Sequence, residues 1–200
     1  MSPRTAHVPN LESREQILAA ALARFQHYGY NKTTMAEIAD DAHMSAANLY
    51  RYFDSKLDMA AACCNVCMEE RLERLRAVAR RPDSLPRKLD AYVIAMIEHT
   101  HEIAITDTKI SELIQTVSRE RPKMIHDRLR AHYALLAEIL QLGNDSGEFE
   151  VVDVGKTARY LYSALVIFDV PIFVGLFSRQ EFEERAHGVV SLLLNGLRKR

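Results

Sequence analysis

Hydrophobic positions recur at helical spacing along most of this chain, and short polar segments separate the apolar stretches. The first stretch predicts a helix that begins at the capping-box sequence Ser13–Gln16 and ends at Gly29. Its apolar face follows the i, i+3, i+4, i+7 spacing and consists of Leu18, Ala21, Leu22 and Phe25. We expect this face to be buried and to carry no chemistry.

Three further helix-capping sequences follow close together. Thr34 and Glu37 form a capping box that predicts a helix from about Met35. Ser45 is a second cap and Ser55 is a third. Helices as short as the two that these caps delimit are unstable alone, so we expect them to pack together. Two short helices joined by a tight turn are typical of a helix-turn-helix, whose second helix lies in the DNA major groove.

Longer helices are predicted in the rest of the chain. One runs from Ser55 to about Arg81, where Pro82 and Pro86 end it. A helix of some 25 residues spans roughly 37 Å, so it can join the short helices to the rest of the chain without a flexible linker. Further helices are predicted at residues 86–105, 109–119 and 122–142, after the cap Asp153, and at 180–197. The fold class is therefore all-α.

Composition agrees with a helical globular chain. The 200 residues are 48% hydrophobic and 26% charged, with seven Gly and six Pro. No apolar run approaches the roughly 18 residues that span a membrane. The first residues lack the apolar core of a signal peptide, which predicts a cytoplasmic protein whose residues 1–12 form a flexible arm.

Net charge does not by itself indicate a nucleic-acid-binding protein. The formal total is −1, and residues 1–60 carry six Lys/Arg against seven Asp/Glu. The acidic residues concentrate on the first short helix, whereas Lys32, Arg51 and Lys56 flank the second. Because few cations are available to contact phosphate, we expect modest non-specific binding, a shallow salt dependence and specific binding by two copies together.

The sequence of the second short helix and its surroundings resembles the TetR family of bacterial transcriptional regulators. The resemblance rests on the run SAANLYRYFDSK at 45–56, the turn GYNKTT at 29–34 and the Ile38–Ala39 pair, and it covers roughly residues 13 to 59. The family often has Gly where this chain has Ala47, a difference that concerns the operator sequence and not the family. The resemblance implies a helix-turn-helix DNA-binding domain at 13–58 and a helical effector-binding and dimerisation domain at 59–200.

Roles within the motif follow from helix-turn-helix geometry and from the resemblance. The first turn of the second helix reads base edges, and Asn48 is suited to adenine. A threonine at a helix N-terminus can bind phosphate. The resemblance places Tyr50 at the groove, Tyr52 against the DNA backbone and Lys56 as a phosphate contact. The predicted DNA-binding residues are Lys32, Thr33, Thr34, Ser45, Ala46, Ala47, Asn48, Tyr50, Tyr52 and Lys56.

The last two long helices are more apolar than the surface of a monomer allows. In the TetR family the final two helices of each subunit form a four-helix dimer interface. The residues predicted to form it here are Leu161, Leu165, Val189, Leu193 and Leu197. A two-fold dimer would place two recognition helices about one DNA turn, ~34–36 Å, apart or a multiple of that, on a near-palindromic operator.

The middle helices are predicted to enclose a pocket for a partly hydrophobic organic effector, although a plain core also fits the pattern. The lining residues would be Tyr92, Met96, His99, Ile103, Leu113, Val117, Ile125, Leu129 and His132. The function expected is that of a homodimeric repressor released from its operator by this small molecule. The alternative is a DNA-bound structural or cell-division factor that binds a protein partner.

Two residue clusters leave other chemistry open. His99 and Glu102 have i, i+3 spacing and could bind a metal with His126 or His132, although solvated or hydrogen-bonded histidines also fit. Cys64 and Cys67 have the CxxC spacing of redox or metal sites, but no second pair exists. We therefore predict no metal and no cofactor. A phosphate-binding loop and a nucleophile motif are both absent from the sequence, so we do not expect an enzyme.

Overall fold

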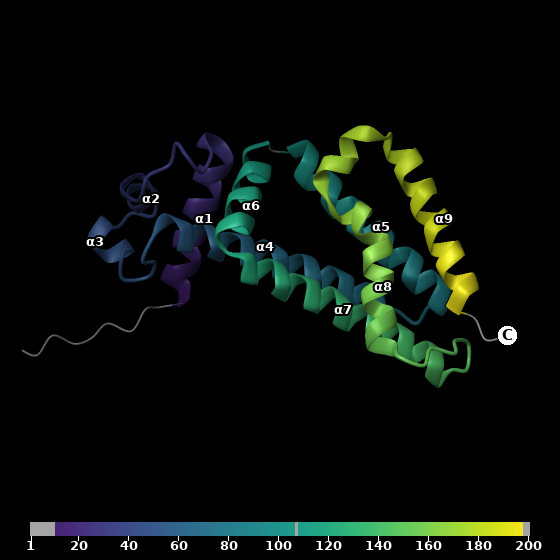
Figure 1. Ribbon diagram of the computed structural model, residues 1–200. Coiled ribbons are helices and arrows are strands. Elements are labelled where there is room, and N and C mark those ends of the chain that lie inside the picture. The colour runs from purple at the N-terminus through teal and green to yellow at the C-terminus, as the bar shows by residue number, and fades with distance from the viewer. Residues whose placement is uncertain (1–10, 107, 198–200) are drawn as a thin grey trace, which may run out of the picture. The chain divides into compact units, whose positions relative to one another are not determined.

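The computed structural model describes residues 11–106 and 108–197, and helices make up its regular structure (Figure 1). The α-helices are α1 Leu11–Tyr28, α2 Met35–Asp41, α3 Ala46–Leu49, α4 Lys56–Ala79, α5 Leu85–Thr106, α6 Thr108–Glu120, α7 Pro122–Asp145, α8 Val154–Leu165 and α9 Arg179–Leu197. Two short 3₁₀ helices, η1 Val166–Asp169 and η2 Pro171–Leu176, separate α8 from α9. The all-α fold class is confirmed.

The chain forms two compact units, and the boundary between them falls inside α4. The first unit consists of the described residues as far as Cys67 and of Lys109–Arg121, which include nearly all of α6. The second unit consists of Met68–Thr108 and Pro122–Arg200, as far as they are described. The chain therefore crosses between the units three times.

In the first unit, α1 packs against α2 and α2 packs against α3. Ile17, Phe25, Ile38 and Leu49 are fully buried where these helices meet. Polar contacts attach α6 to the same unit. The Lys109 ammonium donates to the carbonyl oxygen of His27, and the guanidinium of Arg121, which follows α6, forms an ion pair with Asp58.

In the second unit, α7 packs against α8, and α5 packs against α9 and both 3₁₀ helices. The largest fully buried side chains of its core include Tyr92, Met96, Phe168 and Phe182. Phe168 and Phe182 have ring centroids 5.0 Å apart, which links η1 to α9. This core fixes the position of α5, which carries several of the predicted effector residues.

The predicted helix caps at Thr34, Ser45 and Ser55 are confirmed. Thr34 and Glu37 form a complete capping box, and the Ser45 side chain accepts a hydrogen bond from the Asn48 amide. Ser55 accepts from the amide of Asp58 at 3.1 Å, as a cap does. Local sequence decides where these helices begin, because the caps satisfy amides that have no partner inside the helix.

Three predicted boundaries are wrong. Leu11 is already helical, so Ser13 lies inside α1 and does not begin it. The helix before the 143–153 loop continues through Asp145. The apolar residues Val166 and Phe168, which the pattern places on the helix after Asp153, do not extend α8: it ends at Leu165 and they form the separate 3₁₀ helix η1.

Candidate nucleic-acid interface and effector site

The residues between α2 and α3 form a tight turn. The Met44 amide donates to the Ala39 carbonyl at 2.9 Å, and His43 adopts a positive φ of 54°. A left-handed residue ends α2 and redirects the chain, as glycine does at many helix C-termini. Buried Ile38 and Leu49 hold the two helices against α1. This arrangement is a helix-turn-helix.

One side of α3 faces away from this core, whereas Leu49 packs into it. Ser45, Ala47 and Tyr50 are exposed, whereas Ala46 and Asn48 are half-buried. The Tyr50 side chain is 52% exposed, so it does not pack inward with its neighbour Leu49. The exposed surface of α3 therefore offers small side chains, one amide and one aromatic ring to a partner.

Two predicted phosphate contacts are used inside the protein. Thr33 is buried, and its hydroxyl donates to the Gly29 carbonyl at 2.8 Å. The Lys56 Nζ donates to the carbonyl oxygens of Tyr30 and Thr33, both at 2.8 Å, and lies 4.3 Å from the centre of the Tyr30 ring. Burial lowers the pKa of Lys56. Lys56 thus holds the 30–33 turn in place.

Arg24 neutralises much of the acidic charge of α2. Its guanidinium contacts both carboxylate oxygens of Asp41, at 2.5 and 3.1 Å, and lies 3.2 Å from Glu37. The bond to Arg24 lowers the pKa of Asp41, and the bonds to Thr34 lower the pKa of Glu37. Both carboxylates are therefore ionised and paired at neutral pH, which reduces their repulsion of a nucleic-acid backbone. Lys32 and Thr34 remain exposed, and Tyr52 is half-buried.

In the second unit the structure brings together some of the predicted effector residues. The Tyr92 hydroxyl and His132 Nδ1 are 2.6 Å apart, and both side chains are fully buried, as is Met96. His99, Ile103, Ile125 and Leu129 are half-buried. The two remaining predicted residues, Leu113 and Val117, are buried in α6 and belong to the first unit.

Next to His132 lies a buried polar cluster that the sequence did not indicate. Asp169, with a fully buried side chain, forms ion pairs with Arg71 and with Arg128, the latter at 2.7 Å. The Tyr162 hydroxyl also donates to Asp169, and His132 Nε2 is 3.8 Å from the same carboxylate. We call Arg71, Arg128, His132, Tyr162 and Asp169 the buried polar cluster.

Electrostatics keep the histidines of this region neutral at physiological pH. Burial, reinforced by Arg71 and Arg128, lowers the pKa of His132 to about 3 and that of His99 to about 4. Burial and the nearby Arg128 also lower the pKa of Arg71, to about 10. The region therefore combines neutral imidazoles with charged guanidiniums.

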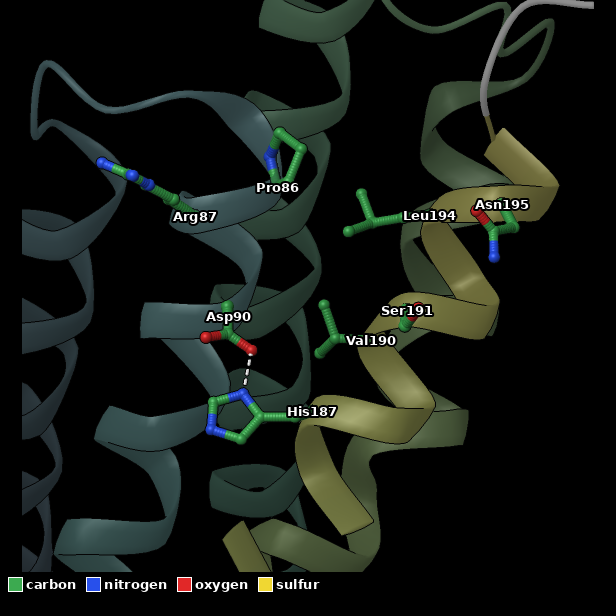
Figure 2. Close-up of a pocket in the computed structure, with 8 residues that line it drawn as sticks. All are labelled: Pro86, Arg87, Asp90, His187, Val190, Ser191, Leu194 and Asn195. Atoms are coloured by element: carbon green, nitrogen blue, oxygen red, sulfur yellow. Dashed lines mark hydrogen bonds and ion pairs between the residues drawn. The ribbon is translucent and has the colours of Figure 1, made fainter. Parts of the chain in front are cut away.

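A groove of about 320 Å³ lies between α5 and α9 in the second unit (Figure 2). Its lining residues are Pro86, Arg87, Asp90, His187, Val190, Ser191, Leu194 and Asn195. His187 Nδ1 and Asp90 Oδ1, drawn facing each other in Figure 2, are 2.5 Å apart. None of the predicted effector residues lines this groove.

The clusters suggested for metal or redox chemistry have ordinary structural surroundings. Across residues 11–106 and 108–197, no group of three or more His, Cys, Asp or Glu side chains is arranged to hold a metal. His99 Nδ1 is 3.7 Å from Glu102. Cys63 is buried and donates to the Leu18 carbonyl, and burial raises the pKa of both Cys63 and Cys64 to about 12. These two thiols are therefore protonated and poorly nucleophilic.

The predicted dimer residues fall into two groups. Leu161 and Leu165 are buried in the core of their own unit, whereas Val189, Leu193 and Leu197 are half-buried against it. A side chain that is already buried has no surface to offer to a partner copy. The large apolar side chains exposed on α8 and α9 are instead Tyr160 and Leu192, at 60% and 74%. No helix within the described part of the chain is long and apolar enough to cross a membrane.

Two family models match the chain. One, for bacterial regulatory proteins of the tetR family, matches residues 17–63, which contain the helix-turn-helix. The other, for a tetracyclin repressor-like C-terminal domain, matches residues 86–190. The second match alone spans more than half of the chain.

Two transcriptional regulators are similar to this chain in sequence. The HTH-type transcriptional regulator YfiR of Bacillus subtilis is 26% identical over 155 residues, which are 76% of this chain and 75% of YfiR. The HTH-type transcriptional repressor KstR2 of Mycobacterium tuberculosis is 26% identical over 153 residues, which are 74% of this chain and 75% of KstR2.

Solved structures share the fold. A regulator from Mesorhizobium loti superposes with a TM-score of 0.76 at 20% identity, over 99% of this chain and 100% of that one. The transcriptional regulator FadR of B. subtilis, in complex with stearoyl-CoA, superposes with a TM-score of 0.64 at 24% identity, over 92% of this chain and 98% of that one.

Proposed function

This chain belongs to the TetR family of bacterial regulatory proteins, and from that premise we propose that it is a homodimeric transcriptional repressor released from a near-palindromic operator by a small molecule. The observation that carries the proposal is the helix-turn-helix, whose α3 is capped by Ser45 and exposes its first turn. Repression is supported by the similarity to KstR2, which is a repressor. The protein would act on the chromosome in the bacterial cytoplasm, as a regulator and not as an enzyme.

We assign base reading to the exposed side of α3. Asn48 suits an adenine, Ala46 and Ala47 suit a thymine methyl, and the exposed Tyr50 extends the same surface. The phosphates beside the groove would be bound by Ser45, Lys32, Thr34 and Tyr52. Thr33 and Lys56 would act indirectly, because their polar groups hold the turn that positions α2.

Dimerisation would supply the affinity that the DNA-binding domain lacks, since residues 1–60 carry six Lys/Arg against seven Asp/Glu. Tyr160 on α8 and Leu192 on α9 are large apolar side chains in solvent, and a self-complementary contact would bury them. We therefore centre the pairing face on these two residues. Val189, Leu193 and Leu197, half-buried on α9, would border it.

The effector would bind in the second unit, at the Tyr92–His132 pair and the residues around it. A small-molecule effector is supported by the likeness to FadR, whose structure contains stearoyl-CoA. Binding would favour a subunit arrangement whose recognition helices no longer match successive major grooves. The helix α4 contributes residues to both units and is the continuous element along which such a change would pass.

The test is selection of DNA by the purified full-length protein, followed by gel shift on the enriched sequence. Tyr50→Ala should abolish the shift without altering the thermal midpoint, since the Tyr50 side chain is 52% exposed. Tyr28→Ala is the matched control, because Tyr28 is 49% exposed at the end of α1 and lies outside the helix-turn-helix.

The expected result is a competitor-resistant complex for wild type and Tyr28→Ala, and none for Tyr50→Ala. The protein should enrich a sequence with two related half-sites. If no sequence is enriched from genomic DNA at low salt, the proposed function is refuted. Equal shifts with both variants would instead refute the assignment of base reading to this side of α3.

A further inference from the structure

The buried polar cluster contains more positive than negative charge. Arg71 and Arg128 each form an ion pair with Asp169, so two guanidiniums share one carboxylate. The Asp169 side chain has no exposed surface, and the Arg71 side chain is only 7% exposed. Buried charges in proteins are normally paired, because a charge that leaves water without a partner loses several kcal/mol of solvation. Among the residues that the structure describes, one positive charge of this cluster is left without a carboxylate of its own.

The surrounding groups do not remove the imbalance. His132 and His99 are neutral at physiological pH and have no negative charge to contribute. The Glu102 carboxylate, 3.7 Å from His99 Nδ1, has a side chain 59% exposed and lies 3.2 Å from Arg74, so solvent and that arginine screen it.

Asp169 already has three partners in the cluster. It accepts hydrogen bonds from Tyr162 and Arg128 and forms an ion pair with Arg71. The carbonyl oxygen of its neighbour Phe168 accepts a hydrogen bond from the Thr100 hydroxyl at 3.1 Å. Arg71 Nε is buried and has no hydrogen-bond partner among the described residues. Arg128, with 22% of its side chain exposed, gives the same cluster access to solvent. The cluster therefore still has a guanidinium donor to offer.

We propose that the effector is an organic acid with a single negative charge, whose carboxylate binds Arg71 and Arg128 in the buried polar cluster. The inference rests on the proposed function and adds the chemical class of its effector. One carboxylate would neutralise the excess charge, and guanidiniums bind carboxylates with two hydrogen bonds in one plane. The apolar part of the acid would contact buried side chains beside the cluster, such as Tyr92, which bonds to His132, and Phe168, which precedes Asp169. A neutral molecule of the same shape would leave the charge uncompensated.

The experiment measures thermal midpoints of the full-length protein with straight-chain carboxylates from acetate to hexadecanoate, each beside the alcohol of equal length. Wild-type protein should be stabilised by carboxylates of suitable length and not by their alcohols. Arg128→Gln should weaken carboxylate binding on the order of 30-fold or more, the effect of removing one partner from a buried charge pair. Arg130→Gln is the matched control, because Arg130 lies on the same helix with its side chain 76% exposed.

Asp169→Asn is a second variant with the opposite expectation. It removes the carboxylate that competes with the ligand, so carboxylates should bind it more tightly than they bind wild type. If it does not fold, Arg128→Gln decides alone, and Arg128→Lys, which retains the charge, should retain part of the binding. The inference is overturned if alcohols stabilise wild type as well as carboxylates do, if no carboxylate stabilises it, or if Arg128→Gln binds as wild type does.

Operator binding shows whether this inference or the proposed function has failed. All three arginine variants should still shift the selected DNA when no carboxylate is present. If the protein selects an operator but binds alcohols as well as carboxylates, the proposal that the effector carries a negative charge is refuted. The repressor proposal then stands. Binding of carboxylates by a protein that selects no DNA would refute the repressor proposal instead.

Discussion

The Nζ atom of Lys56 lies 2.8 Å from the carbonyl oxygen of Thr33, and this bond joins the first turn of α4 to the residue before the cap of α2. Lys56→Met should lower the free energy of unfolding by roughly 1–3 kcal/mol, the usual contribution of a charged hydrogen bond. The measurement is a urea titration of the full-length protein. DNA affinity should fall as well, because the helix-turn-helix loses its support.

Lys32→Met is the matched control, since Lys32 is exposed on the same turn. It should leave the urea midpoint unchanged and reduce the slope of log affinity against log salt by about 0.9, the effect of one lost phosphate contact. If Lys56→Met instead reduced the salt slope and left stability intact, Lys56 would be a phosphate contact.

His132 should make the protein less stable as the pH falls below neutrality. Burial lowers the pKa of folded His132 to about 3 from its ordinary value of 6.5. The unfolded chain therefore binds more protons than the folded one below pH 6.5, and stability decreases with falling pH until about pH 3. Between pH 7 and pH 5 the loss from this residue is about 2 kcal/mol. Urea midpoints across this range measure it.

His132→Gln should reduce that pH dependence by the same amount while lowering stability at pH 7. Glutamine has no proton to take up in this range but can still bond to the Tyr92 hydroxyl. Identical pH profiles for wild type and variant would show that His132 titrates normally in the folded protein.

Gly143 in α7 is required by the close approach of Phe149. A Cβ atom at this position would lie 2.1 Å from the Phe149 ring, which is buried. Gly143→Ala should therefore destabilise the protein by roughly 1–3 kcal/mol, the cost of overpacking, although alanine is the better helix former. Gly155→Ala is the control, because its Cβ would have ordinary contacts in α8. It should be neutral or stabilising by up to about 1 kcal/mol in thermal unfolding.

Leu192→Glu should dissociate the proposed dimer. A carboxylate at the centre of an apolar pairing face would have to lose its hydration, so the variant should sediment as a monomer and bind operator weakly. Val152→Glu introduces the same charge at a fully exposed loop position and should remain dimeric. A Leu192→Glu protein that sediments as wild type does would move the pairing face elsewhere.

Features governed by neighbouring residues were predictable from the sequence. Thr34, Ser45 and Ser55 cap their helices because a side-chain oxygen and an amide three residues later meet wherever a helix starts. Pro82 and Pro86 likewise indicated the end of α4, which stops at Ala79. The family resemblance then supplied the function of the motif.

Features that depend on residues distant in the chain were not predictable. Arg71, Arg128 and Asp169 come from α4, α7 and η1, and no spacing in the sequence connects them. Leu161 and Leu165 have the same apolar character as an interface residue, and periodicity does not reveal whether the covering surface belongs to the same chain or to a second copy. The donors of Lys56 illustrate the same limit, because a lysine near a DNA-binding motif can also bond to backbone carbonyls that lie far away in the sequence.

The place of α6 in the first unit has a consequence for synthesis of the protein. Residues 109–121 complete that unit, although the rest of it ends at Cys67. A ribosome working at roughly 5–20 residues per second needs several seconds to make the intervening segment. During that time the helix-turn-helix has left the ribosome without the contacts of Lys109 and Arg121. We therefore expect nascent chains stalled before residue 109 to be more sensitive to protease in their first 67 residues than chains stalled well beyond residue 121.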